Sequence, residues 1–195
     1  KSSLKTCSIA VLLAGTAFGG QAVAGPALNT LPTGETVVSG HATFDRTADK
    51  QLTINQSTNK LITNWNSFDV GSAAKVNFVQ PNTNSIALNR ITSGSPTEVF
   101  GQVTANGRLV LVNPNGITFG GRSQVSANAL IASVLDIQDS DFNTSTLLFK
   151  RGNATGSIEN RGKLTTTAGS VSLLAPTVKN SGSITVTRGD ANLIN

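Results

Sequence analysis

The sequence of 195 residues contains one cysteine, one histidine, no methionine and no tyrosine. The cysteine, Cys7, lies in a segment that we predict to be removed, which would leave no thiol for disulfides, redox chemistry or metal binding. The histidine, His41, is the one imidazole that could act as a base, and no Gly-x-Ser-x-Gly sequence accompanies it. The mature chain would therefore lack a cysteine nucleophile, and it offers a serine hydrolase one possible base and no nucleophile elbow.

Charged residues make up 13% of the chain and aromatic residues 5%. The formal net charge is +5, and removal of Lys1 and Lys5 with the predicted leader leaves 13 basic and 10 acidic residues, or +3. Apart from the pair Lys150 and Arg151, the remaining cations are spread singly. Because nucleic-acid binding needs clustered cations, with aromatic side chains for single strands, we expect no nucleic-acid partner.

The acidic residues are scattered as well. Glycoside hydrolysis needs two carboxylates at a fixed separation, and lyases need a base and often Ca²⁺. The one acidic cluster, Asp136, Asp139 and Asp141, could offer oxygens to a cation but lacks the glycine and glutamate positions of a calcium loop. We therefore predict a solvated loop or a turn cap there, with no bound metal, no cofactor and no enzymatic activity.

The N-terminus has the pattern of a secretory signal peptide. Lys1 and Lys5 precede an apolar run over 9–18, which is followed by Ala22-Val23-Ala24. A positive start, about ten apolar residues and an A-x-A site are typical of this signal, and the run is too short to span a bilayer as a stable helix. The pattern predicts cleavage after Ala24, which leaves residues 25–195 as one exported domain.

Abundant Thr, Ser, Asn and Gly favour strands and turns, and no long helical pattern follows the leader. Short apolar and β-branched runs alternate with turn residues. We predict strands at Thr36–Ser39, Leu52–Asn55, Leu61–Asn64, Lys75–Gln80, Ser85–Leu88, Arg108–Val112, Val125–Ala127 and Leu130–Val134. The segment Asp136–Asn143 is the best candidate for a short helix or a loop. This pattern indicates an all-β fold rich in turns.

The C-terminal third contains a repeat with an offset of 20 residues. The sequence Ile-Glu-Asn-Arg-Gly-Lys-Leu-Thr at 158–165 recurs as Val-Lys-Asn-Ser-Gly-Ser-Ile-Thr at 178–185, and 169–173 matches 189–193 in the same way. A period near 20 with short strands is typical of a β-solenoid, in which apolar positions stack on those of the next turn. We expect each Asn-x-Gly to form a corner, with glycine in a left-handed conformation and asparagine bonded to the backbone.

The most distinctive local sequence is Asn113-Pro114-Asn115-Gly116-Ile117, which follows the apolar strand 108–112. Asn at the first position, Pro at the second and Gly at the fourth are the preferences of a type I turn. From the residues alone, this segment is either a tight structural turn or a recognition element.

Several further segments occur with this turn in a fixed order. They are Thr-Asn-Trp-Asn-Ser-Phe-Asp-Val at 63–70, Val-Asn-Phe-Val-Gln-Pro-Asn at 76–82, Ala-Leu-Asn-Arg-Ile at 87–91, Asn-Gly-Arg-Leu at 106–109 and Ala-Ser-Val-Leu-Asp-Ile at 132–137. Together they resemble the haemagglutination-activity domain of two-partner secretion exoproteins, especially the high-molecular-weight adhesins. The resemblance extends from Val37 to the end of the chain.

The resemblance implies a right-handed parallel β-helix with an N-terminal cap and extra-helical strands. It also implies that the chain directs a longer Gram-negative exoprotein to the cell surface or the medium. The partner would be a cognate outer-membrane β-barrel transporter with periplasmic POTRA-type domains, and the downstream region would bind a host or bacterial surface. The family's Asn-Pro-Asn-Gly-Ile motif matches Asn113–Ile117. A second motif, Asn-Pro-Asn-Leu, is matched only in part by Gln80, Pro81 and Asn82.

A stand-alone carbohydrate-binding or polysaccharide-degrading β-helix is the alternative. Trp65 and Phe68 could stack on a sugar or form part of the core. The sequence stops within the repeat, with Leu193 and Ile194 still on the stacking pattern. A finished solenoid needs a polar cap, so we expect further coils to follow, which favours a secretion domain.

Overall fold

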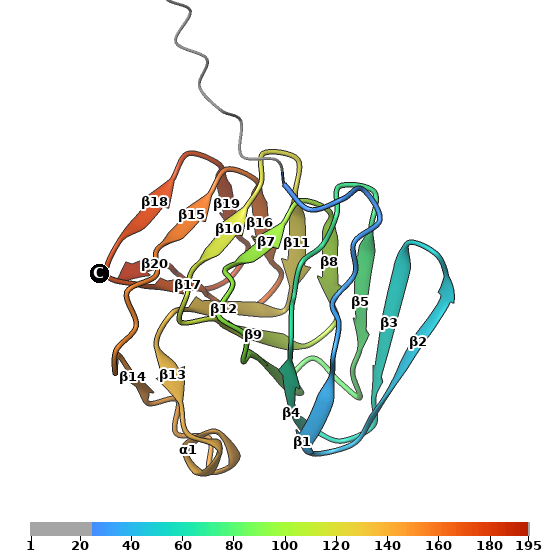
Figure 1. Ribbon diagram of the computed structural model, residues 1–195. Helices are drawn as coiled ribbons and strands as arrows, with labels where there is room; N and C mark the ends of the chain where they lie inside the picture. The colour runs from blue at the N-terminus through green and yellow to red at the C-terminus, as the bar shows by residue number, and fades with distance from the viewer. Residues whose placement is uncertain (1–24, 195) are drawn as a thin grey trace, which may run out of the picture.

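The computed structural model describes residues 25–194. The predicted signal peptide, 1–24, lies outside the described residues, and so does its processing site. Within 25–194 the chain winds through three sheets that form the faces of a solenoid (Figure 1). No helix in this part of the chain is long and apolar enough to cross a membrane.

Two seven-stranded sheets form the larger faces. Sheet I has the order β1 (Thr36–Ser39), β4 (Lys60–Trp65), β6 (Ile86–Ile91), β9 (Arg108–Val112), β12 (Ala129–Ser133), β17 (Val171–Leu174), β20 (Ala191–Ile194). Sheet II has the order β2 (Ala42–Ala48), β3 (Gln51–Gln56), β5 (Lys75–Val79), β8 (Gln102–Ala105), β11 (Gln124–Ala127), β16 (Lys163–Thr166), β19 (Ser183–Val186). The third face, sheet III, is β7 (Thr97–Val99), β10 (Ile117–Phe119), β15 (Ile158–Asn160), β18 (Val178–Asn180).

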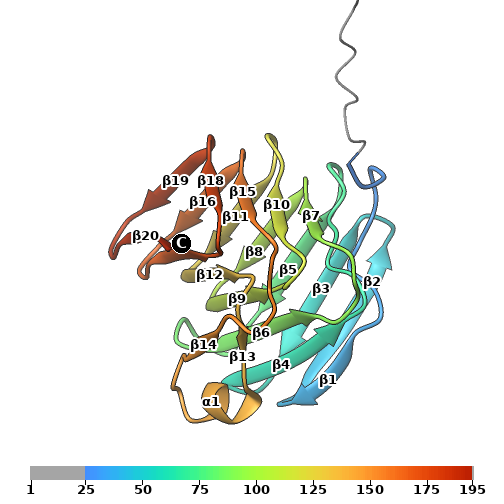
Figure 2. The same ribbon diagram turned by 60° about the vertical axis from the view of Figure 1, so that its left-hand side comes forward.

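Successive coils pair in parallel, so each strand lies beside its counterpart from the previous turn (Figure 2). Ile158 pairs with Val178 and Leu164 with Ile184, which is the 20-residue offset of the sequence repeat. Stacked coils in one register align apolar side chains on the inside of every turn. The predicted right-handed parallel β-helix is confirmed.

Two antiparallel strands close the N-terminal end. β1 pairs with β4, and β2 pairs with β3, in the direction opposite to the parallel strands. The lead-in at 27–33 covers the edge of the third face, where Gly71 donates to the carbonyl of Thr30 (2.9 Å) and Thr33 bridges to Ser67. These segments supply backbone hydrogen-bond partners to the first coil and form the N-terminal cap that the resemblance implies.

The interior of the solenoid is apolar, and its first coils are rich in aromatic side chains. Trp65 and Phe68 are fully buried, and their ring centroids lie 5.3 Å apart in an edge-to-face arrangement. Phe78 stacks on Phe68 at 6.4 Å. The indole N–H of Trp65 donates to Asn89 Oδ1 at 3.0 Å. Of the two roles left open for Trp65 and Phe68, the structure therefore shows core packing.

An insertion at 135–157 leaves the solenoid between β12 and β15. It contains β13 (Asp136–Ile137), the short helix α1 (Asp139–Asn143) and β14 (Phe149–Lys150), with β13 and β14 paired antiparallel. Ile137 and Phe142 are buried against the outer face of sheet I, in a second apolar cluster separate from the solenoid interior. These are the extra-helical strands predicted from the resemblance. They cover the outer face of β6, whose inner face packs in the solenoid core.

Every strand predicted from the sequence is present, with ends that differ by up to three residues. The sequence pattern did not predict β2, β7, β8, β10, β13 and β14, which are short, polar or close to glycine and proline. One expectation was wrong: Gly162 and Gly182 do not have positive φ. They are required for close approach, since a Cβ on Gly162 would lie 2.6 Å from the carbonyl oxygen of Gly120, and one on Gly182 would lie 2.2 Å from that of Gly162.

Candidate functional site

The segment Asn113–Ile117 forms the corner between β9 of sheet I and β10 of sheet III. Gly116 N donates to the carbonyl of Asn113 at 3.1 Å, which closes a four-residue turn. Asn115 N donates to Asn113 Oδ1 at 3.0 Å, so the asparagine side chain also bonds inside the turn. The turn predicted from the sequence is therefore formed, and its first residue holds it from within.

The Asn113 side chain also reaches the preceding coil. Its amide donates to the carbonyl of Ser95 and to Thr97 Oγ1, both at 3.0 Å. Asn113 and Thr97 are fully buried, so the Asn113 amide and the Thr97 hydroxyl have both lost their water. A buried polar group without a hydrogen-bond partner costs free energy, so replacing Asn113 would leave its partners unpaired and destabilise this corner.

Gly116 connects the turn to the following coil. Its φ is +118°, a conformation that side chains other than glycine rarely adopt. A Cβ here would lie 3.0 Å from the Ser157 carbonyl oxygen of the next coil, and one on Gly156 would lie 2.4 Å from Gly116 N. Three successive coils therefore meet at this turn with almost no free space.

Burial limits what a partner could touch at this turn. Asn113, Gly116 and Ile117 are buried, whereas Pro114 is half-buried and Asn115 is exposed. Asn115 is itself tied to the preceding coil, since its amide donates to the carbonyl of Ser93 at 2.9 Å. Direct recognition would thus be restricted to Pro114 and Asn115.

The second motif, Gln80-Pro81-Asn82, forms a different corner, between β5 of sheet II and β6 of sheet I. Gln80 is buried, and its side chain bonds to Gln56 of the coil before (3.2 Å) and to Gly107 N of the coil after (2.9 Å). Asn82 Oδ1 accepts from Ser85 N at 3.1 Å. The motif is a second set of corner bonds, and the structure does not bring it together with Asn113. The two corners lie at opposite ends of the strands of sheet I. A five-residue strand such as β9 is roughly 17 Å long, so the corners are about that far apart.

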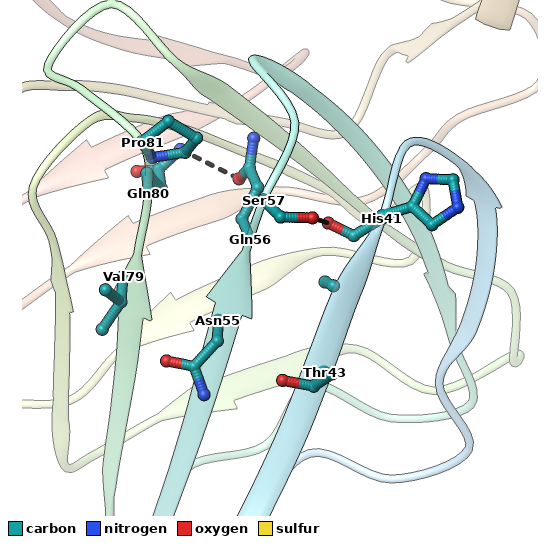
Figure 3. A pocket seen from close by; sticks show the side chains of 9 residues that line it. His41, Thr43, Asn55, Gln56, Ser57, Val79, Gln80 and Pro81 are labelled. Carbon is teal, nitrogen blue, oxygen red and sulfur yellow. Dashed lines mark hydrogen bonds between the residues drawn. The ribbon is translucent and has the colours of Figure 1, made fainter.

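A shallow groove lies beside this second motif on the outer face of sheet II (Figure 3). Thr43, Asn55 and Val79 occupy neighbouring positions on β2, β3 and β5, and Pro81 lies above them. His41 is exposed at the rim, with its ring directed away from Asn55 and Val79. Its backbone, and not its imidazole, bonds to Thr58 and Ser57. The groove brings no carboxylate to His41, so it does not assemble a hydrolytic pair.

The acidic cluster pairs with a guanidinium. Arg90, on the outer face of β6, lies 2.9 Å from both Asp136 Oδ1 and Asp139 Oδ1. It also donates to the carbonyl of Ile137. Two of the three carboxylates therefore fasten the insertion to the solenoid, which corrects the expectation of a merely solvated loop. Among residues 25–194, no group of three or more His, Cys, Asp or Glu side chains could hold a metal ion.

A second carboxylate pair was missed from the sequence. Glu98 N donates to Asp69 Oδ1 at 2.8 Å, at the edge of sheet III. Burial raises the pKa of Asp69, and burial together with the charge of Asp69 raises the pKa of Glu98. The two residues are 29 positions apart, so only the pairing of Val70 with Val99 could have revealed them.

The architecture is shared with proteins of known structure and known family. Residues 29–194 match the family model of the TPS secretion domain. The secretion domain of HMW1 from Haemophilus influenzae superimposes with a TM-score of 0.76 at 35% identity, over 80% of this chain and 42% of that chain.

Curated relatives are much longer than this chain. A heme/hemopexin-binding protein of Haemophilus influenzae strain Rd is 38% identical over 108 residues, which are 55% of this chain and 12% of the relative. A second protein of that name from Haemophilus influenzae is 33% identical over 114 residues, again 12% of its length. By the match over 29–194 and the shared fold, the chain belongs to the family of TPS secretion domains.

Proposed function

We propose that this chain is the secretion domain of a larger Gram-negative exoprotein. In this proposal a cognate outer-membrane β-barrel transporter recognises the domain through periplasmic POTRA-type domains and exports the exoprotein to the cell surface or the medium. Membership of the TPS family supports the proposal, as does 35% identity with the HMW1 secretion domain.

The observation that carries the proposal is the capping of one end. β1, β2 and the lead-in at 27–33 supply partners to the first coil, and every later coil pairs only with its neighbours. Such a solenoid can add one coil at a time as the chain emerges from a transporter. Each folded coil opposes backward movement, because its ladder bonds and buried side chains would have to be broken. The capped coils are thus the template on which the exoprotein folds.

Within this proposal the Asn113–Gly116 turn acts through the stability of that template. Its buried amide and its left-handed glycine join three coils. Loss of the turn would slow formation of the template, and secretion would fall with stability. The weaker motif at Gln80–Asn82 would act in the same way at its own corner.

The downstream region would carry the activity of the whole protein. The curated relatives are about eight times longer than the segment they share with this chain, since it covers 12% of each. We propose an adhesin-type passenger that binds a host or bacterial surface, and a secretion domain without catalytic activity.

Processing at Ala24 is part of the same proposal. Gly25 packs so tightly on Phe100 that a Cβ would lie 2.0 Å from the ring, which makes Gly25 part of the folded domain. Intact-mass measurement of secreted protein should show a chain that begins at Gly25. Secreted material that retains the apolar run would contradict the signal-peptide prediction.

The decisive experiment is a secretion assay. Residues 1–195 are fused to a reporter enzyme and produced in a Gram-negative host with or without the cognate transporter. Reporter activity should reach the medium only when both the domain and the transporter are present, and the reporter behind the signal peptide alone serves as control. Export without the transporter, or retention in its presence, would reject the proposed function.

A further inference from the structure

A small polar groove lies at the corner where sheet III passes into sheet II, the corner reached from β10 to β11 in Figure 1. It is lined by the loop before β5, by the start of β8 and by the start of β11. The charged and amide side chains in this lining are Lys75, Gln102, Arg122 and Gln124, and the other lining residues are small: Ser72, Ala73, Ala74 and Gly101.

Three of the lining residues belong to a column of side chains in register along the solenoid axis, and this column extends beyond the groove to Lys163. Lys75 of β5 pairs with Gln102 of β8, which pairs with Gln124 of β11, which pairs with Lys163 of β16. The next residue in each of these strands, such as Val76, is buried, so the column itself points outward. Strands lie about 4.8 Å apart, so Lys75 and Lys163 are roughly 14 Å apart, with two amides between them.

The cations of the groove and of the column carry uncompensated charge. Within residues 25–194, Lys75, Arg122 and Lys163 make no ion pair and no side-chain hydrogen bond, whereas Arg46, Arg90 and Arg161 are all paired with carboxylates. No residue that lines the groove is acidic. The nearest turn, between β2 and β3, contributes Asp49 and Lys50, whose charges cancel. The groove therefore attracts anions.

We propose that this groove binds a sulfated polysaccharide. A sulfate group accepts hydrogen bonds from several directions, which suits an ammonium, a guanidinium and two amides that approach from different strands. The column rises by about one strand spacing per coil, close to the length of one sugar residue in an extended chain. A neighbouring row of uncharged side chains, Asn77, Thr104, Ser126 and Thr165, presents hydroxyl and amide groups to sugar hydroxyls.

The lining disfavours other anionic chains. It contains no aromatic side chain on which the bases of a single-stranded nucleic acid could stack. It also contains no apolar pocket for the side chains of an acidic peptide. The proposal is independent of transporter recognition, so its failure would leave the proposed secretion function untouched.

The test is binding of the purified protein to immobilised heparin, measured by surface plasmon resonance at low and at physiological salt. We expect K75Q/R122Q/K163Q to weaken binding about tenfold or more, since three ion pairs and their hydrogen bonds are lost. The matched control is K150Q/R151Q/R188Q, which removes three exposed, unpaired cations elsewhere and leaves the same net charge. The control should bind like the parent protein. Thermal melts verify that both variants are folded.

Further probes separate the possible ligands. Hyaluronan carries carboxylates but no sulfate, dextran is neutral, and poly-L-glutamate is an acidic peptide. Weak binding of all three, with tight heparin binding that depends on the column, supports the proposal. Equal loss of heparin binding in the two triple variants would show attraction by net charge alone and overturn it. Equal affinity for hyaluronan or poly-L-glutamate would overturn the assignment to sulfate or to a sugar chain.

Discussion

Asn113 illustrates how a single buried amide can serve two purposes. Its oxygen accepts from Asn115 N inside the turn, and its amide group donates to Ser95 and Thr97 of the preceding coil. Aspartate would keep the acceptor and lose the donors, and alanine would lose both. The residue therefore links the local turn to the stacking of coils.

Substitution in this turn should lower the free energy of unfolding. We expect Asn113→Ala to cost about 1–3 kcal/mol, because buried groups on two coils lose their partners. Gly116→Val should cost about 1–3 kcal/mol, because φ is +118° and the new side chain meets Ser157. Urea unfolding provides the measurement.

The control for this turn is Asn115→Ala, which removes an exposed side chain and should cost less than either change. Secretion should fall in proportion to stability across the three variants. Unchanged unfolding together with lost affinity for the transporter's isolated periplasmic domains would contradict a structural role and make the turn a docking element.

Asp69 and Glu98 should make stability depend on pH. Both pKa values are raised in the folded chain, so both carboxyls hold protons at higher pH than in the unfolded chain. The stability that protonation adds is present at low pH and is lost as pH rises through the folded pKa values. The pair therefore opposes folding near neutral pH.

Asp69→Asn should relieve this cost and keep the bond from Glu98 N. We expect a higher melting temperature than the parent near pH 7, and no gain near pH 3, where both carboxyls are protonated. The pKa of Glu98, followed by NMR, should fall towards its ordinary value because the neighbouring charge is gone. A Glu98 pKa that does not move would show that the two groups are not coupled.

At the scale of elements, corners are held by close backbone approach. Gly162 packs on Gly120 and Ser123, and an added Cβ would lie 2.0 Å from Ser123 Oγ. Gly94, in contrast, has no atom within 4 Å of its Cβ position. Glycine is thus required at one loop and only tolerated at the other.

This difference gives a matched pair of variants. Gly162→Ala should destabilise by about 1–3 kcal/mol, because the two coils must separate. Gly94→Ala should be neutral or stabilising by up to about 1 kcal/mol, because it restricts the unfolded chain. Differential scanning calorimetry of both would measure the effect, and equal melting temperatures would refute the close-approach argument.

The insertion at 135–157 ties the fourth coil to the first two. Lys60 donates to the carbonyl of Asn143 and to Ser145 Oγ at the end of α1, 83 and 85 residues away. Arg90 pairs with Asp136 and Asp139. Both cations lie beneath the insertion and beside the apolar cluster that contains Phe142, so polar and apolar contacts act together.

Arg90→Gln should weaken this docking. We expect a loss of about 1–3 kcal/mol in water and a smaller difference in high salt, because the partner carboxylates are partly exposed and salt screens them. Asp141→Asn is the control, since the pairing of Arg90 involves Asp136 and Asp139 only. Equal losses in the two variants would mean that the ion pairs contribute nothing specific.

At the scale of the whole molecule, stability rests on stacked coils and a continuous core. Neighbouring strands in each of the three sheets come from successive coils, so almost every strand depends on the next coil for its hydrogen-bond partners. The described residues contain no metal-binding group. Removal of divalent ions with EDTA should therefore shift the melting temperature by less than about 2 °C. A larger drop would indicate a bound divalent cation and contradict this prediction.

The sequence by itself determined the fold class, the 20-residue repeat and the Asn113–Gly116 turn. Each of these depends on local pattern: alternation of apolar residues, turn preferences, or a repeat that stacks on itself. The positive φ of Gly116 could be anticipated for the same reason, since a type I turn favours glycine at its fourth position.

Only the tertiary structure decided which distant groups meet. It placed Arg90 under Asp136 and Asp139, Asp69 beside Glu98, and Lys75 in register with Lys163. It also showed that Gly162 is needed for space and not for its φ. The physical reason is that coil length varies outside the C-terminal repeat, so strand register follows from packing and ladder bonds across the whole solenoid.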